Sequence, residues 1–421
     1  MPRLTRADWV KINAKLDESP EKFGLPERRA DSFVFSSFNI RRLGAKRNRN
    51  SEEWEFLRRY CRQCDLIAVQ EVQDDLEGLS HLKELLGPNY GMAASDITGA
   101  KPGESSSSSE RLAFLFNWTR ISRTEIASDL TFDRSSVLGG LYEEREAFAA
   151  DFDKREADLA KWEKKRQKRI DDWIAGGKVG KKPKAPAKPP FVLSNFLTFI
   201  RTPYCVSFRA PGLGDAEPYE FLAVDAHLLY GHKSKQKEER ELEFQALVLW
   251  LIWRAQNVKN LYHKNLILFG DLNLDFEETD QRRDRIETFI KSLNAKQLDS
   301  LEAARLNFPF LDIHPSRRDI ADPNEAFFRS TARLTQTYDQ IALLIDDKRL
   351  PNSDANDTAG TPDADDYDYG VFNFTELFAQ ALHKKNYKNL SKTKKQELIK
   401  SYEHKVSDHL PIWIRLRVPG T

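Results

Sequence analysis

The chain has 421 residues, with 66 Lys and Arg against 65 Asp and Glu and a formal net charge of +1. It contains no uninterrupted apolar run of about 18 residues, which excludes a membrane-spanning helix. Its start lacks the apolar core of a secretory signal, and three cysteines are too few for a disulfide framework. We therefore expect a globular, cytoplasmic protein.

Short apolar runs alternate with helical stretches from Asp31 onward. Before them, residues 1–30 form a polar N-terminal arm in which Thr5 caps a short helix. The predicted strands are 31–40, 65–71, 112–117, 196–200, 204–208, 220–227, 265–271, 337–345 and 412–418. The predicted helices are 51–61, 74–86, 234–254, 279–293 and 391–404. Strands with helices between them predict layered α/β structure.

Three charged segments interrupt this alternation. Residues 351–370 hold six Asp and no basic residue, which predicts a disordered loop, and 383–400 hold seven Lys and one Glu. Residues 135–190 form a helical insertion that returns on a Lys/Pro linker. Within it, 151–190 carry 13 Lys and Arg against 7 Asp and Glu, an excess of six. This insertion is either an arm that binds DNA phosphates, or a solvated linker or docking surface for a protein partner.

Seven polar patterns stand at the ends of predicted strands: FNIRRLG, VQEV, SERLAFLF, DAHLLYG, FGDLNLD, TYDQIAL and SDHLPIW. Their hard oxygen ligands suit Mg²⁺, Mn²⁺ or Ca²⁺ rather than zinc, and they come from Asn39, Glu71, Asp271, Asn273 and Asp408. His227 and His409 are the proton-transfer candidates, and Glu110 and Asp339 could each orient one of them. Carboxylate–His pairs around a divalent ion are suited to phosphate ester hydrolysis.

In this order, the patterns resemble those of the endonuclease/exonuclease/phosphatase superfamily, and most closely its deoxyribonuclease I branch. FNIRRLG is close to the opening strand motif of that branch, with Arg41 in place of an acidic residue usual in the abasic-site endonucleases. FIRTPYCVSF is similar to the segment whose arginine contacts the scissile phosphate, which here is Arg201. The resemblance covers 33–134 and 191–418. It implies a four-layer α/β sandwich of two packed mixed β-sheets flanked by helices.

The resemblance also implies a role for each site residue. Glu71 is the principal metal ligand, beside Asn39 and Asp408, and Mg²⁺ is the expected ion. His409, paired with Asp339, is the general base. His227, paired with Glu110, assists the leaving oxygen or holds the phosphate. Asp271 and Asn273 orient the nucleophile and phosphate oxygens, while Arg201 and Arg41 hold the DNA phosphate.

The expected activity is metal-dependent endonucleolytic hydrolysis of DNA with little sequence specificity, leaving 5′-phosphate and 3′-hydroxyl ends. The expected catalytic domain is 31–134 with 191–421. One departure concerns the substrate, since Ser108 stands where the branch has an aromatic residue that reaches into the minor groove. Two alternatives stay open. The first is a phosphatase or phosphodiesterase acting on RNA, inositol phosphate or another phosphate ester. The second is a catalytically silent binding module.

Overall fold

The computed structural model describes residues 3–99, 109–130, 145–178, 180–186, 199–231, 265–274, 305–364 and 367–421, with isolated positions between 236 and 288. The chain divides into two compact units. The main unit is formed by 1–130 and 199–421, and the smaller unit by 131–198. Each unit is described by itself.

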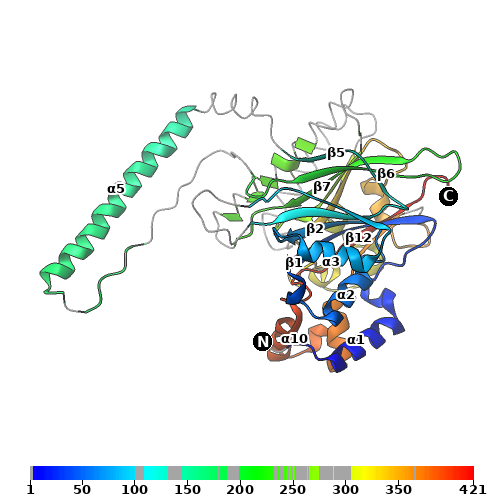
Figure 1. The fold of residues 1–421 in the computed structure, drawn as a ribbon, viewed down its shortest axis with the longest axis horizontal. Helices are drawn as coiled ribbons and strands as arrows, with labels where there is room; N and C mark the ends of the chain where they lie inside the picture. Colours follow the sequence, from blue (N-terminus) through cyan, green and yellow to red (C-terminus); the bar gives the residue numbers. More distant parts are fainter. Residues whose placement is uncertain are drawn as a thin grey trace. The chain divides into compact units, whose positions relative to one another are not determined.

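Two six-stranded mixed sheets form the centre of the main unit (Figure 1). The first sheet has the order β11 (Tyr367–Val371), β12 (Ile412–Arg417), β1 (Ser32–Leu43), β2 (Leu66–Val72), β4 (Arg111–Asn117) and β3 (Tyr90–Ala94). The second has the order β5 (Ser122–Asp129), β6 (Tyr204–Ala210), β7 (Tyr219–His227), β8 (Asn265–Asp271), β10 (Asp339–Ile345) and β9 (Arg305–Asn307). Pairs β1–β2 and β7–β8 are parallel, and the others are antiparallel.

Aromatic side chains fill the space between the sheets. Phe35 of β1 meets Phe221 of β7 with ring centroids 5.3 Å apart, and Phe114 of β4 meets Phe208 of β6 at 5.5 Å. Strand β8 is buried along its whole length. A strand covered on both faces consists of consecutive apolar residues, which explains the run LILF.

Helices cover the outer face of the first sheet (Figure 1). They are α1 (Arg6–Glu18), α2 (Ser51–Cys61), α3 (Glu77–Leu86), α9 (Phe374–His383) and α10 (Lys392–Tyr402), and a short helix α8 spans Pro323–Ala326. Beside the second sheet, the described positions between 236 and 251 are helical and bury Phe244, Leu247 and Leu251. The predicted fold class, a four-layer α/β sandwich, is confirmed.

The residues expected to form an N-terminal arm pack into the main core. Thr5 caps α1 in a capping box with Asp8. Trp9, which is 2% exposed, contacts Phe56 of α2 and Phe378 of α9 at ring-centroid distances of 5.4 and 5.7 Å. Helix α1 therefore packs against α2 and α9 rather than standing apart.

The prediction of a disordered loop over 351–370 is wrong for the residues that are described. Ser353–Asp357 forms a 3₁₀ helix, and β11 pairs with β12 from Tyr367 to Val371. Tyr367 and Tyr369 are buried, while the charge of Asp368 is met by Arg415 at 3.4 Å. The alternation of buried tyrosines therefore favours a strand here, although the acidic composition predicted disorder.

Several elements of the structure differ from the predicted ones. Strands β3, β5, β9 and β11 and helix α9 were not predicted. Of the predicted strand 196–200, only residues 199 and 200 are described, and neither lies in a strand. The predicted helix 279–293 lies outside the described residues, except Thr288.

The smaller unit contains the long helix α5 (Arg145–Ala175) followed by a non-helical return segment, 180–186. The Nε1 of Trp162 donates to the Pro186 carbonyl at 2.9 Å, and Arg169 donates to the Lys184 carbonyl at 3.3 Å. Two side chains of the helix therefore hold the return segment against it. In the part of the chain that is described, no helix is long and apolar enough to cross a membrane.

Candidate active site

Two parallel strand pairs bring the predicted residues to one end of the sandwich. Asn39 of β1 is the register partner of Gln70 on β2, directly before Glu71. His227 and Asp271 end β7 and β8, where they are register partners. Asp339 begins β10, antiparallel to β8 and opposite Asp271. Since parallel strands end where their antiparallel neighbours begin, residues far apart in sequence meet at one edge.

Glu71 and Asn273 have unusual backbone conformations. Their φ angles are 60° and 52°, in the left-handed region that non-glycine residues rarely adopt. Glu71 lies at an irregularity where the pairing of β2 with β4 shifts between Val69 and Val72. Such strain concentrates at functional sites, where surrounding structure holds it in place. Both residues carry side chains that the sequence analysis assigned to the site.

Gly270 allows Asp271 to come close to β7. A Cβ atom at this position would lie 1.9 Å from the carbonyl oxygen of Ala226. No other residue type fits such a close approach of two backbones. The glycine of the FGD motif thus has a steric role beside the site.

The first sheet contributes an oxygen cluster. Asn39 Nδ2 donates to Glu71 Oε1 at 3.2 Å, while Glu71 Oε2 accepts from the backbone N–H of Arg42 at 3.1 Å. Arg41 forms an ion pair with Asp408 at 2.7 Å. Arg41 is therefore engaged with a predicted metal ligand in this structure, although the sequence analysis assigned it to the substrate phosphate.

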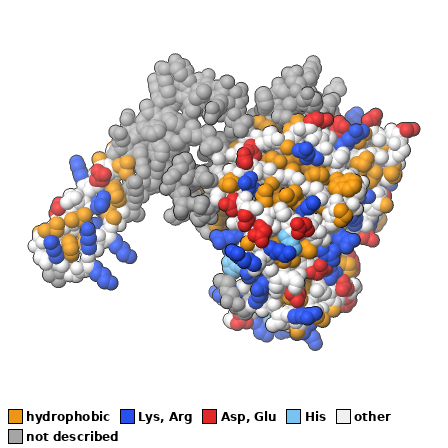
Figure 2. All heavy atoms as spheres, viewed as in Figure 1, with side chains coloured by type: hydrophobic (Ala, Val, Ile, Leu, Met, Phe, Trp, Pro, Cys, Tyr) orange, Lys and Arg blue, Asp and Glu red, His pale blue; other side chains and the backbone are white. Residues whose placement is uncertain are grey.

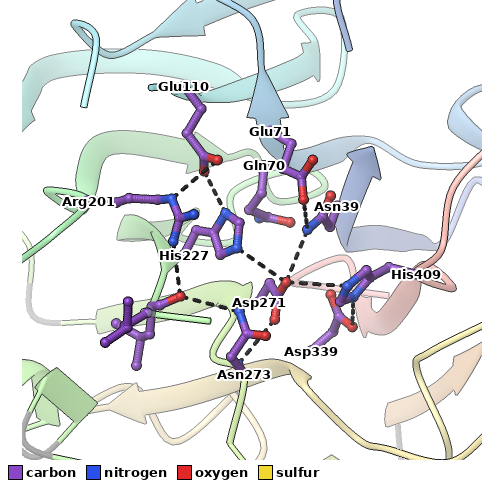
Figure 3. Close-up of polar contacts among 12 residues, drawn as sticks. Asn39, Gln70, Glu71, Glu110, Arg201, His227, Asp271, Asn273, Asp339 and His409 are labelled. Carbon is purple, nitrogen blue, oxygen red and sulfur yellow. Dashed lines mark hydrogen bonds and ion pairs between the residues drawn. The ribbon is translucent and has the colours of Figure 1, made fainter. Parts of the chain in front are cut away.

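Two His–carboxylate pairs, each with one member from either sheet, share Asp271 (Figure 3). His227 and Asp339 lie on β7 and β10 of the second sheet, while Glu110 directly precedes β4 and His409 precedes β12 of the first. His409 Nδ1 lies 2.8 Å from Asp339 Oδ2, and His227 Nδ1 lies 2.5 Å from Glu110 Oε1. The opposite nitrogens of both rings face one oxygen, with Nε2 of His227 at 3.4 Å and Nε2 of His409 at 3.5 Å from Asp271 Oδ2.

Arg201 completes the His227 side. Its Nε lies 3.2 Å from Glu110 Oε2, and its NH1 donates to the Leu228 carbonyl at 3.2 Å. The same carbonyl accepts from Asn273 Nδ2 at 3.2 Å. Asn273 also donates its backbone N–H to Asp271 Oδ1 at 3.1 Å. Arg201 and Asn273 thus donate to the same backbone oxygen, that of Leu228.

The two imidazoles differ in their protonation. Burial and the neighbouring Arg201 cation together lower the pKa of His227 to about 4. Burial also raises the pKa of Glu110 to about 7, against the opposing effect of Arg201. Burial disfavours a cation at His409 as well, but the Asp339 and Asp271 carboxylates outweigh it and hold that pKa well above its usual range. Such divergent pKa values typify acid–base sites.

Two sets of residues could hold a divalent ion. Asp271, Asp339 and His409 place ligand atoms within 4.8 Å of one another. However, His409 Nδ1 and Asp339 already hydrogen-bond each other, and Mg²⁺ prefers oxygen ligands alone. Glu71, Asn39 and Asp408 offer only oxygens. Among the described residues, Asn39 Oδ1 and Asp408 Oδ1 are buried and have no hydrogen-bond partner. Asp339 Oδ1 of the first set is also buried without a hydrogen-bond partner in the described part of the chain. We favour the second set, because a cation would satisfy two of its atoms and because it offers oxygen ligands alone.

Two serines that the sequence analysis did not consider support the site. Ser407 Oγ accepts from the backbone N–H of His409 at 3.0 Å and donates to the Asn39 carbonyl at 2.6 Å. Ser330 Oγ accepts from the backbone N–H of Asp339 at 3.0 Å. Ser407 lies inside the SDH pattern and could have been singled out there. No local pattern marks Ser330, which reaches the site by tertiary packing.

Comparison with known proteins finds similarity in solved structures alone. No protein-family model matches this sequence, and no curated protein matches it. An endonuclease/exonuclease/phosphatase family protein from Bacteroides thetaiotaomicron is 15% identical over 93% of this chain and 99% of its own, with a TM-score of 0.42. The human Nocturnin catalytic domain is 12% identical over 91% and 93%, with a TM-score of 0.43. A mannosyl-6-phosphatase from Bacteroides thetaiotaomicron is 14% identical over 91% and 98%, with a TM-score of 0.40. Similarity at this level carries no argument about the activity of this chain.

Proposed function

We propose that this chain is a divalent-metal-dependent endonuclease that hydrolyses phosphodiester bonds of DNA with little sequence specificity. The observation that carries the proposal is the sharing of Asp271 by two His–carboxylate pairs, beside the Glu71–Asn39 oxygen cluster. A single His–carboxylate pair could be an ordinary buried hydrogen bond and would not by itself indicate a hydrolase. The two pairs supply two proton-transfer groups, and the oxygen cluster beside them supplies a cation site at the same edge of the sandwich.

In the proposed reaction, water attacks the phosphorus in line with the leaving 3′ oxygen. His409 accepts the proton of that water in its neutral form. Asp339 and Asp271 stabilise the resulting imidazolium, which also raises the pKa of His409, so the neutral form becomes more populated as the pH rises. The P–O3′ bond breaks, which leaves a 5′-phosphate and a 3′-hydroxyl. The His227–Glu110 pair stands on the other side of Asp271. Neutral His227 donates a proton to the leaving oxygen and takes up the proton of Glu110, whose pKa burial raises to about 7.

The remaining groups neutralise and orient the phosphate. Glu71, Asn39 and Asp408 would hold Mg²⁺, with Mn²⁺ and Ca²⁺ as alternatives, and the ion would neutralise phosphate charge and favour ionisation of water. The planar guanidinium of Arg201 lies in the site, and a guanidinium can donate parallel hydrogen bonds to two phosphate oxygens. Asn273 orients the phosphate oxygens, and the hydrogen bond from its backbone N–H to Asp271 fixes its own position.

We further propose that the smaller unit binds the phosphate backbone. Between residues 157 and 186 there are ten Lys and Arg and four Asp and Glu, an excess of six. The described residues of this segment form one ion pair, Lys161–Asp158 at 3.8 Å. Figure 2 shows the Lys and Arg side chains standing out along the helix. Unpaired cations gain affinity for DNA by releasing its counterions.

The test is a matrix of substrates and metals. Labelled duplex DNA, single-stranded DNA, RNA and an inositol phosphate are each incubated with Mg²⁺, Mn²⁺, Ca²⁺ or EDTA. We expect cleavage of DNA that EDTA abolishes. Hydrolysis of the inositol compound alone would replace the nuclease assignment with a phosphatase, and hydrolysis of RNA alone would make the chain a ribonuclease. No hydrolysis of any substrate would favour a silent binding module.

A further inference from the structure

A chain of buried polar side chains crosses from one sheet to the other beneath the site. Gln70 Nε2 donates to Asp225 Oδ1 at 2.6 Å and to Ser37 Oγ at 3.2 Å. All three residues are 0% exposed. Gln70 lies on β2 and Ser37 on β1, whereas Asp225 lies on β7 of the opposite sheet. The sandwich interior around them is otherwise dominated by aromatic and aliphatic side chains.

Each member of this polar chain lies just before a site residue on its own strand. Ser37 precedes Asn39 by two positions, and Asp225 precedes His227 by two. Residues two apart on a strand share a face, so both pairs point into the space between the sheets. Gln70 directly precedes Glu71, whose left-handed backbone breaks the normal alternation. Figure 3 shows Gln70 beside Glu71 and Asn39 at the site.

Stability gives no obvious reason for this arrangement. Gln70 Oε1 and Asp225 Oδ2 are buried without a hydrogen-bond partner among the described residues, which is costly. Burial also holds the pKa of Asp225 well above its usual range. Replacing buried polar pairs with apolar residues of similar volume is often neutral or stabilising. A directional hydrogen bond does, however, define one position of β2 against β7, while apolar contacts tolerate small shifts.

We propose that Gln70 and Asp225 are positioning residues that hold the Glu71–Asn39 cluster in place against His227 and Asp271. The inference rests on the proposed function, since it assigns these two groups to one reaction. It predicts that the pair matters more for the reaction rate than for the free energy of unfolding.

The experiment compares Gln70→Leu, Asp225→Leu and the double variant with wild-type protein. The unfolding temperature, kcat and KM on duplex DNA, and Mn²⁺ affinity by calorimetry are measured for each. Asp225→Asn is the conservative variant, because its amide keeps an acceptor oxygen at the same distance. Phe35→Leu is the matched control, since Phe35 contacts Phe221 across the same sheets but four residues before Asn39.

We expect the double variant to unfold at or above the temperature of either single variant, while its kcat stays about tenfold or more below wild type. KM should change little, and Asp225→Asn should recover most of the rate lost in Asp225→Leu. Phe35→Leu should lose stability and keep its rate. A double variant with wild-type kcat, or an equal loss of rate in Phe35→Leu, would overturn the positioning role. If the double variant does not fold, Gln70→Met provides the same comparison, because it matches the volume of glutamine.

Metal affinity separates failure of this inference from failure of the proposed function. Loss of positioning should weaken Mn²⁺ binding about tenfold, a measurement that needs no substrate. A wild-type protein that cleaves no DNA, with Mn²⁺ affinity that still falls in the leucine variants, would contradict the nuclease assignment alone. Unchanged Mn²⁺ affinity together with unchanged kcat in the leucine variants would contradict the inference alone.

Discussion

Asn39 donates through Nδ2 to Oδ2 of Asp271 at 3.0 Å, which joins two residues 232 positions apart and links the two sheets. The same carboxylate oxygen faces both imidazoles of the site (Figure 3). Burial raises the pKa of Asp271, while His409 lowers it. Asp271 is therefore the meeting point of the oxygen cluster and the two His–carboxylate pairs.

Asp271→Asn should nearly abolish hydrolysis and leave the fold intact. Asparagine keeps the shape but loses the negative charge that both imidazoles face, so we expect kcat to fall about 10²- to 10⁴-fold. Single-turnover cleavage measures the rate, and circular dichroism checks the fold. Asp17→Asn is the control, because Asp17 forms an exposed ion pair with Arg59. A rate within threefold of wild type would remove Asp271 from the mechanism.

Glu71→Gln should weaken metal binding. The substitution replaces a carboxylate ligand with a neutral amide, so the Mg²⁺ concentration for half-maximal activity should rise about 10- to 100-fold. Calorimetry with Mn²⁺ should show the same shift. Glu55→Gln, which alters an exposed carboxylate paired with Arg58, should leave both values unchanged. An unaltered metal requirement in Glu71→Gln would instead favour the set formed by Asp271, Asp339 and His409.

Arg201→Lys should impair both binding and rate, although the charge is kept. The guanidinium reaches Glu110 and the Leu228 carbonyl at once, and an ammonium group lacks that fork. We expect kcat/KM on duplex DNA to fall about tenfold, the equivalent of about 1.4 kcal/mol. Arg209→Lys, at a half-exposed position beside Glu220, is the control. Equal kcat/KM for the two variants would argue against a phosphate contact by Arg201.

Neutralising the basic face of α5 should reduce the salt dependence of DNA binding. Lys164, Lys165 and Lys168 are exposed on this helix, and replacing all three with Gln should lower the log–log salt slope by about 2 to 3. Fluorescence anisotropy at several salt concentrations measures the slope. The control replaces three cations of α1, namely Arg6, Lys11 and Lys15. An unchanged slope in the α5 variant, or an equal change in the control, would leave the smaller unit as a solvated linker or protein-docking surface.

Trp9→Ala should destabilise the main unit by about 3–5 kcal/mol, the range for truncating a buried Trp or Phe. Trp9 contacts Phe56 and Phe378, so its loss leaves a cavity between α1, α2 and α9. Urea denaturation followed by tryptophan fluorescence and circular dichroism measures the change. Val10→Ala, at a position that is 64% exposed, should change stability little. Equal unfolding midpoints for the two variants would show that residues 1–30 are a separate arm.

The predictable parts of the fold are those with a strong local pattern. Strand β8 was predicted with the bounds that it has, because an uninterrupted apolar run between polar residues is typical of a strand covered on both faces. Strand β5 was missed because the sequence SRTEIASD lies largely exposed at a sheet edge and shows little apolar alternation. Strand β11 was missed because six Asp residues concealed its buried tyrosines.

The site was predictable in its residue types but not in its connections. Patterns such as DAH, GDLN and SDH mark strand ends, and the order of the strands places them together. No local pattern predicts that Arg41 pairs with Asp408 or that Gln70 contacts Asp225 across 155 positions. Such contacts depend on the packing of two sheets, which a single sequence does not encode in any short segment. The roles of the individual site residues stay predictions.

The most direct test of the central claim is nicking of supercoiled plasmid DNA by wild-type protein, with and without EDTA, beside His409→Ala. We expect wild-type protein with Mg²⁺ to convert supercoiled plasmid to nicked circles that DNA ligase reseals, since ligase requires 5′-phosphate and 3′-hydroxyl ends. EDTA and His409→Ala should each abolish nicking. Nicking by wild-type protein that persists in EDTA, or that His409→Ala retains in full, would contradict metal-dependent hydrolysis at this site.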